Sequence, residues 1–391
     1  MQKQLLDYIL TAMLESHPNV SDINITVDKP PQVETAGVLK PVEFDPPIER
    51  LTSFQSEIMA LGLVGGDRRL TRDLMKRGSC DISYQLAGKA RLRVNVFSQK
   101  GCYSIAMRQL PSRVPSIEEL KLPPVFKKVT EDRNGLVLLT GATGTGKSTT
   151  LAALINEINE KRPVHIVTLE DPVEFVHAQK AGTVNQRELG IDFDNFASGL
   201  RAAVRQAPKV ILVGEMRDRE TVEIALSASE TGHLVLSTLH TIDAGHTINR
   251  ILGMFDPHEE RLVRIRLADS LRWIVCQRLL PKTGGDRAAA FEIMGSSLRA
   301  KDLILHGETE DRTFYGIIEE SNAFGMVTFE QSIARLFEQG LVTEETAISF
   351  ANRRSAIRRS IDSIKSARGE KTTSIGDLSI DTEYGRRPGR Y

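Results

Sequence analysis

The sequence predicts an α/β protein in which a larger domain with a mainly parallel sheet follows a smaller α+β domain. From about residue 135, short apolar runs alternate with helical patterns, which is typical of strands and helices layered around a parallel sheet. A glycine-rich segment, residues 141–148, lies between the first of these runs and the helical pattern after it. In the first 110 residues, three β-prone runs are separated by Gly88 and Gly101, which favours an antiparallel meander.

Length, charge and cysteine usage restrict the class of protein. At roughly 150 residues per domain, the 391 residues predict two or three domains. The 51 Lys and Arg residues balance the 51 Asp and Glu residues, which argues against a protein whose whole surface binds nucleic acid. Cys80, Cys102 and Cys276 are too widely spaced for a zinc knuckle or a disulfide framework, which favours the reducing cytoplasm. No segment reaches the roughly 18 apolar residues that span a bilayer, so we expect no direct membrane insertion.

The smaller domain is expected to span residues 1–110. Its first segment places Leu6, Leu10 and Met13 at helical spacing, which predicts an amphipathic helix packed on its own domain. Apolar and polar residues alternate over 21–28, which predicts a half-buried strand. The runs of the meander follow at residues 80–88, 90–98 and 102–110.

A proline-punctuated stretch, residues 111–134, is expected to link this domain to the larger one, residues 135–350. Beyond residue 257 the pattern is mainly helical, with an arginine-rich helix near 260–280 and one strand at 288–294. Residues 351–391 form a basic extension that is expected to begin as a helix and to be disordered over roughly its last twenty residues. The sheet of the larger domain is predicted from apolar runs at 136–140, 165–169, 210–214 and 234–238.

The segment GATGTGKS, residues 141–148, matches the phosphate-binding pattern GxxxxGK[ST]. Its glycines let backbone N–H groups turn toward phosphate oxygens, where a Cβ would block the approach. The helix that begins near Lys147 adds the positive end of its dipole. Lys147 is expected to reach the β and γ phosphates, and the Ser148 hydroxyl to bind Mg²⁺. The expected nucleotide contacts are Gly141, Ala142, Thr143, Gly144, Thr145, Gly146, Lys147, Ser148 and Thr149.

Acidic residues and histidines lie at the ends of the other predicted strands. Glu170 ends the second strand and Glu215 follows the third, at the carboxyl edge where α/β sheets bind ligands. Such carboxylates can orient an attacking water and hold a metal ion, and the alternative for each is a helix cap or a surface charge. His233 begins the fourth strand and His240 follows it, and each is either a site residue or a hydrogen-bonded interior histidine.

Four segments together resemble a known family. They are GATGTGKS, TLEDPVEF (168–175), VILVGEMRD (210–218) and GHLVLSTLHT (232–241), which look like the Walker A, Asp box, Walker B and His box of the secretion-type hexameric ATPases. The resemblance is closest to the PilT/PilU family of type IV pilus retraction ATPases and runs from about residue 20 to 345. It extends to the segments SDINITVDKPP, ARLRVNVF, AMRQLPSRVPSIEEL and GMVTFEQSIARL.

This resemblance implies a RecA-like P-loop NTPase core after a smaller PAS-like N-terminal domain, assembled into a homo-hexamer. ATP and Mg²⁺ would bind between the core of one subunit and the N-terminal domain of its neighbour. By the family pattern, Glu170 is the catalytic base, Glu215 with Ser148 holds the metal, and His240 senses the nucleotide state.

The resemblance also implies how the energy of ATP is used. Arg93 and Arg108 match N-terminal-domain arginines that reach phosphates in this family, and the alternative for each is an ordinary exposed strand charge. ATP hydrolysis would power pilus retraction and twitching motility at the cytoplasmic face of the inner membrane. The implied partners are an inner-membrane pilus platform protein and, in a mixed ring, a related motor ATPase.

Other functions stay open at this point. The extension after Asn352 and the weakly matching segment at 298–305 are compatible with an accessory, PilU-like member. An assembly or secretion ATPase typically has a four-cysteine zinc module in its core, which Cys276 alone cannot form. A ring nucleic-acid translocase would use the arginine-rich helix, but the apolar positions of that helix keep core spacing, so we expect no nucleic-acid partner. A scaffold with little catalysis would not need both acids and Lys147.

Overall fold

The computed structural model describes residues 3–370. Contacts divide the chain into two units, Met1–Phe126 with Ser148–Glu215, and Lys127–Lys147 with Met216–Tyr391. The division passes through the larger expected domain, so the boundaries at residues 110, 134 and 350 stay predictions. Residues 371–391, which include the tail that was expected to be disordered, lie outside the described part of the chain.

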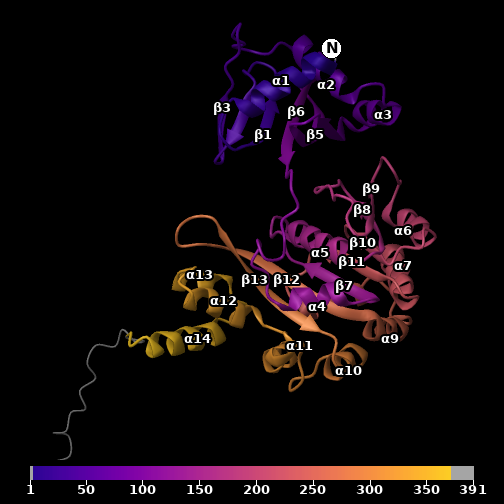
Figure 1. The fold of residues 1–391 in the computed structure, drawn as a ribbon, viewed down its shortest axis with the longest axis vertical. Coiled ribbons are helices and arrows are strands. Elements are labelled where there is room, and N and C mark those ends of the chain that lie inside the picture. Colours follow the sequence, from indigo (N-terminus) through magenta and orange to yellow (C-terminus); the bar gives the residue numbers. More distant parts are fainter. Residues whose placement is uncertain (1–2, 371–391) are drawn as a thin grey trace, which may run out of the picture. The chain divides into compact units, whose positions relative to one another are not determined.

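The N-terminal part of the first unit holds a six-stranded antiparallel sheet in the order β3-β2-β1-β6-β5-β4 (Figure 1). Strands β4, β5 and β6 pair in sequence order, which confirms the predicted meander. Strands β2 and β3 of this sheet were not predicted, because four residues are too few to show a strand pattern. The strands are β1 (Val20–Ile25), β2 (Gln32–Thr35), β3 (Val38–Pro41), β4 (Ser79–Leu86), β5 (Ala90–Gln99) and β6 (Cys102–Leu110).

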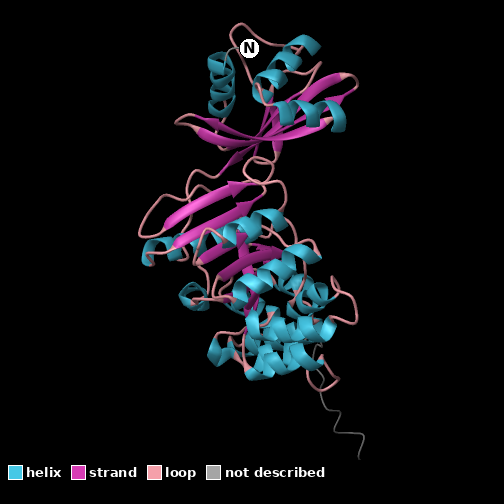
Figure 2. Ribbon diagram, turned by 90° about the vertical axis from the view of Figure 1, so that its right-hand side faces the viewer, coloured by secondary structure: helices cyan, strands magenta, loops and turns pink. Residues whose placement is uncertain are grey.

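Helices α1 (Lys3–Glu15), α2 (Ser53–Val64) and α3 (Arg68–Arg77) pack against the strands of this sheet, and Figure 2 shows helices over one of its faces. The predicted N-terminal helix is confirmed, because Leu6, Leu10 and Met13 of α1 are fully buried. Along β5 the buried Leu92 and Val94 face the same core, whereas Arg93 between them faces away from it.

The larger sheet has seven strands in the order β13-β12-β7-β11-β10-β8-β9. In the first unit, β8 pairs in parallel with β9 and β10, and in the second unit β7 pairs in parallel with β11 and β12. The four predicted apolar runs are therefore confirmed as strands of a mainly parallel sheet. The strands are β7 (Gly135–Thr140), β8 (His165–Glu170), β9 (Thr183–Glu188), β10 (Val210–Val213), β11 (Leu234–Leu239), β12 (Leu271–Pro281) and β13 (Arg287–Gly295).

One helix precedes β7, and the others lie between strands of this sheet in the chain. They are α4 (Val125–Glu131), α5 (Lys147–Lys161), α6 (Phe196–Val204), α7 (Arg219–Glu230), α8 (Ala244–Leu252) and α9 (Glu260–Ser270). The helical patterns predicted after the first and third strands correspond to α5 and α7. Helix α4 forms inside the stretch expected to be a linker, because Phe126 and Val129 are buried there.

The arginine-rich helix expected near residues 260–280 is wrong in its second half. Helix α9 ends at Ser270, and the following eleven residues form strand β12. Leu271 and Ile274 continue the helical spacing of the preceding apolar residues, so periodicity does not mark the boundary. Pairing decides the structure: β12 lies between β7 and β13, where Ile274 is completely buried.

The remaining elements follow β13, which contains the strand predicted at 288–294. They are α10 (Leu298–His306), α11 (Phe314–Glu320), α12 (Phe329–Glu338), α13 (Glu344–Phe350) and α14 (Arg354–Ala367). Ile357 and Ile361 of α14 are buried, so the basic extension begins as a packed helix. Every helix within residues 3–370 is too short or too polar to cross a lipid bilayer.

Candidate active site

The glycine-rich segment forms the loop between β7 and α5. All six residues of β7 are buried, and the strand ends immediately before Gly141. Gly141, Gly144 and Gly146 have φ angles of 142°, 80° and 87°, which glycine adopts without strain. A Cβ on Gly141 would lie 2.5 Å from the carbonyl oxygen of Gln277 on β12. The loop therefore lies so close to β12 that its first residue must be glycine.

Lys147 begins α5 and is only 8% exposed. Its Nζ donates to the carbonyl oxygens of Gly141 at 2.8 Å and Ala142 at 2.9 Å. A phosphate oxygen forms a stronger, charge-assisted bond with an ammonium than a carbonyl does. The loop thus holds its lysine beside the backbone that is expected to surround a phosphate. The neighbouring Ser148 is exposed, in the first turn of α5.

Two neighbouring strands of the first unit end in the predicted acids. In the parallel pair β8 and β10, Leu169 lies opposite Val213, so Glu170 and Glu215 leave the sheet at the same edge. The N–H of Gly214 donates to the carbonyl oxygen of Leu169 at 2.7 Å. A Cβ on Gly214 would lie 3.1 Å from that oxygen, so glycine allows this close approach. Both acids are partly exposed and can meet solvent.

The carboxylate of Glu170 is held by two side chains. Thr168 Oγ1 donates to Glu170 Oε1 at 2.7 Å, and Gln186 Nε2 donates to the same oxygen at 3.0 Å. Desolvation by the surrounding protein raises the pKa of Glu170 above its ordinary value, and these two hydrogen bonds offset part of the rise. A carboxylate with a raised pKa is a better proton acceptor than an ordinary glutamate.

The loop after Glu170 is anchored to β9. The N–H of Val173 donates to Glu188 Oε2 at 3.1 Å, and the N–H of His177 donates to Gln186 Oε1 at 2.8 Å. His177 is 7% exposed, and its Nδ1 has no hydrogen-bond partner. Burial, with a smaller contribution from Lys180, lowers the pKa of His177 to about 4.

Strand β11 separates the two predicted histidines. The carbonyl of His233 accepts from the N–H of Gly135 at 3.0 Å, at the start of β7. His240 instead follows Leu239, which pairs with Thr140 just before the phosphate loop. The second unit therefore brings His240, but not His233, to the phosphate-loop end of the sheet. The Nδ1 of His233 lies 3.0 Å from the Ala228 carbonyl oxygen, a contact that closes the end of α7.

The two predicted arginines are cross-strand neighbours. Arg93 of β5 lies opposite Arg108 of β6, and both are exposed. Arg108 Nε donates to Asp22 Oδ1 at 2.8 Å. Two guanidinium groups therefore lie side by side on adjacent strands, and that of Arg108 is ion-paired with Asp22.

Arg91, which the sequence prediction missed, makes more contacts than either of them. Its Nη2 donates to Glu188 Oε2 at 2.8 Å and to Ser83 Oγ at 2.6 Å, and its Nη1 donates to the carbonyl oxygen of Val173. It therefore ties β5 to β9 and to the loop that follows Glu170. The available signal was the alternation in RLRVNVF, which puts Arg91 and Arg93 on the same face of the strand.

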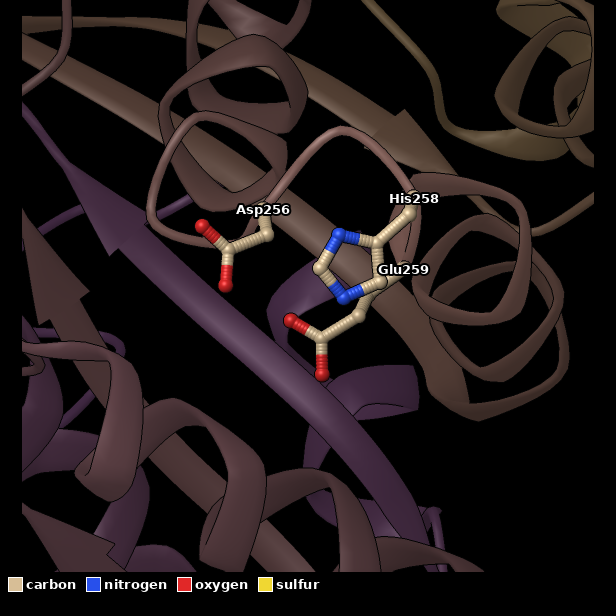
Figure 3. A group of neighbouring side chains, drawn as sticks. All are labelled: Asp256, His258 and Glu259. Carbon is tan, nitrogen blue, oxygen red and sulfur yellow. The ribbon is translucent and has the colours of Figure 1, made fainter.

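Among the described residues, one group of three side chains has the spacing of metal ligands. The ligand atoms of Asp256, His258 and Glu259 lie within 4.8 Å of one another (Figure 3). Arg219 already supplies positive charge there, because it bonds to Asp256 at 3.2 Å and to Glu259 at 2.7 Å. The group is therefore an ion-paired cluster between α8 and α9, and it lies outside the predicted site.

The strand, loop and helix around Lys147, with acids at the ends of β8 and β10, define a P-loop NTPase with a RecA-like core behind an N-terminal domain. The sequence profile of the family described as Type II/IV secretion system protein matches residues 48–316, more than half of the chain. The chain belongs to this family of ATPases. Within it, the chain is a member of the PilT/PilU group of type IV pilus ATPases.

Three relatives support this assignment. The type IV pilus retraction ATPase PilT of Pseudomonas aeruginosa is 40% identical over 84% of this chain and 93% of its own length. The type IV pilus ATPase PilU of the same organism is 35% identical over 94% of this chain and 96% of its own length. A crystal structure of the pilus retraction motor PilT with bound ADP matches this structure with a TM-score of 0.81 and 39% sequence identity. The match covers 91% of this chain and 99% of the PilT chain.

Replacing Gly141 with alanine tests the geometry of the phosphate loop. We expect nucleotide affinity to fall by roughly tenfold or more, because the new Cβ meets a backbone oxygen at a positive φ. Gly232→Ala is the matched control: Gly232 also has a positive φ of 99°, but no atom lies within 4 Å of its Cβ position. Titration with a fluorescent ATP analogue measures both. Equal affinities of the two variants would contradict the steric account.

Protonation of His177 is expected to destabilise the protein in acid. Because its pKa is lowered to about 4 in the folded state, stability is fully present above pH 6.5 and falls as the pH drops toward 4. The loss amounts to at most about 3 kcal/mol. Urea unfolding at several pH values should show a flatter dependence for His177→Gln than for the wild type. Identical slopes for the two proteins would refute the assignment.

Proposed function

We propose that this protein is a hexameric ATPase motor that powers type IV pilus retraction and twitching motility. The observation that carries the proposal is the held, desolvated carboxylate of Glu170 at a strand end, in a chain that also has the phosphate loop and belongs to the PilT/PilU group. A binding scaffold would need the loop but not a carboxylate with raised proton affinity.

In the proposed reaction, the loop at 141–149 binds the triphosphate of ATP, and Lys147 exchanges its carbonyl partners for phosphate oxygens. Glu170 accepts a proton from a water molecule as that water attacks the γ-phosphorus. The bond between the γ-phosphorus and the bridging oxygen breaks, and ADP and inorganic phosphate leave. Proton transfer by a positioned carboxylate typically contributes a rate factor of about 10² to 10⁴.

Ser148 and Glu215 are the residues that we assign to Mg²⁺. An accessible hydroxyl at the start of α5 and a partly exposed carboxylate after β10 are the oxygen donors that this ion prefers. When bound, the ion neutralises phosphate charge as it develops. His240 is proposed to respond to nucleotide from the loop end of β11.

In the proposed ring, Arg93 and Arg108 reach the nucleotide of a neighbouring subunit. Their exposure and cross-strand position leave them accessible to a phosphate from outside the subunit. An arginine that meets phosphate only when an interface closes couples hydrolysis to movement of that interface. The motor is proposed to act at the cytoplasmic face of the inner membrane on a pilus platform protein.

Two substitutions separate binding from chemistry. Lys147→Ala should weaken ATP binding, because it removes the charged phosphate contact. Glu170→Gln should leave binding close to normal and lower kcat by roughly 10² to 10⁴-fold, because the amide cannot accept the proton. Phosphate release and nucleotide titration measure the two effects, with the exposed Glu310→Gln as control. Full turnover by Glu170→Gln would exclude Glu170 as the base.

Deletion of the gene tests the direction of work. Loss of retraction should give cells with excess pili and no twitching, whereas loss of pili would indicate an assembly ATPase. The alignment with PilU extends over 94% of the chain, which favours an accessory motor as the second candidate. In that case twitching should require a related motor ATPase as well as this one.

A further inference from the structure

Gln186 lies on β9 at the point where β8 ends in Glu170. The two strands are parallel, with Thr168 opposite Gln186, so the Gln186 side chain can reach the residue that follows Leu169. Its Nε2 donates to Glu170 Oε1 at 3.0 Å and to the carbonyl oxygen of Phe175 at 2.7 Å. Its Oε1 accepts from the N–H of His177 at 2.8 Å. One amide thus bonds both to the carboxylate and to the loop after it.

The donors around Glu170 are arranged unequally. Thr168 Oγ1 and Gln186 Nε2 both reach Oε1. Two donors from adjacent strands fix the plane of the carboxylate, because rotation about its last torsion would break at least one bond. Oε2 receives neither of these side-chain donors. The backbone N–H of Glu174 also bonds to the carboxylate, and the Glu174 side chain is the nearby charge that repels it.

We propose that Gln186 is a positioning residue for ATP hydrolysis: it holds Glu170 Oε1 so that Oε2 accepts the proton of the attacking water. This inference rests on the proposed role of Glu170 as the base. Gln186 itself touches neither water nor nucleotide in the proposed step. A misplacement of the base by about 1 Å can lower the rate on the order of a hundredfold, so loss of a positioning residue should lower kcat measurably.

A purely structural role for Gln186 has a matched comparison in the same loop. Gln179 Nε2 donates to the Val184 carbonyl oxygen at 2.7 Å, and its Oε1 accepts from the Val184 N–H at 2.8 Å. Like Gln186, Gln179 fastens the loop to β9 through both ends of its amide. Unlike Gln186, it has no bond to Glu170. The two glutamines therefore separate anchoring of the loop from positioning of the carboxylate.

The test compares Gln186→Met, Gln186→Glu and Gln179→Met in the full chain. Methionine has a similar length and no polar group. Glutamate keeps an acceptor for the N–H of His177 but cannot donate to Glu170 when ionised. We expect both Gln186 variants to lower kcat by roughly ten- to a hundredfold, with the dissociation constant for ATP changed less than twofold. Gln179→Met should keep the wild-type kcat.

The outcomes are distinct. A fall in kcat confined to the Gln186 variants, and no further fall when Gln186→Met is added to Glu170→Gln, would support the positioning role. Wild-type kcat in Gln186→Glu would overturn it, as would an equal fall in kcat for Gln179→Met. If Glu170→Gln alone keeps full turnover, the proposed base fails. If Glu170→Gln is inactive and Gln186→Glu is fully active, only the inference about Gln186 fails.

Discussion

The proposed chemistry depends on a carboxylate that is kept at the end of a buried parallel strand, where the protein removes most of its water. Strand β8 is buried from Ile166 to Leu169, and it presents Glu170 where hydrogen bonding to the next strand ends. Desolvation destabilises the ionised form of Glu170, and the hydrogen bonds from Thr168 and Gln186 offset part of this destabilisation. The Glu170 carboxylate therefore takes up a proton readily and is fixed in orientation.

The same edge strand holds more than the carboxylate. Gln186 and Glu188 are two residues apart on β9 and so lie on one face of it. Gln186 binds Glu170, while Glu188 binds Arg91 of β5 and the N–H of Val173. An ion pair whose side chains are only 16% and 10% exposed is costly to break by removing one partner. A short edge strand thereby connects the proposed base with the N-terminal sheet.

Much of the fold could be predicted from the sequence, because buried parallel strands are mainly apolar. This holds for β7, β8, β10 and β11, and the phosphate loop follows from its own spacing. Strand β9 was missed because Val184 is the single apolar residue in its sequence, TVNQRE, so neither an apolar run nor an alternation marks it. Strand β12 was missed because its apolar residues continue the spacing of α9.

The candidate site was predicted less completely than the fold. Residues with a characteristic motif, such as Lys147 and Glu170, could be found from the sequence. Gln186 and Arg91 act through contacts with segments that are distant in the chain, which local patterns do not indicate. His233 was grouped with His240 because both flank one strand, yet the two ends of a strand lie on opposite edges of a sheet.

The proton affinity of Glu170 is the most direct measure of this account. Infrared spectra of the protein with ¹³C-labelled glutamate, recorded across the acid range, follow the carboxyl bands of the glutamates as they are protonated. The difference between wild type and Glu170→Gln isolates one band. This band should titrate above the ordinary glutamate value of 4.5, because burial raises the pKa of Glu170. Titration at or below that value would contradict it, because the strand end would then hold an ordinary surface acid.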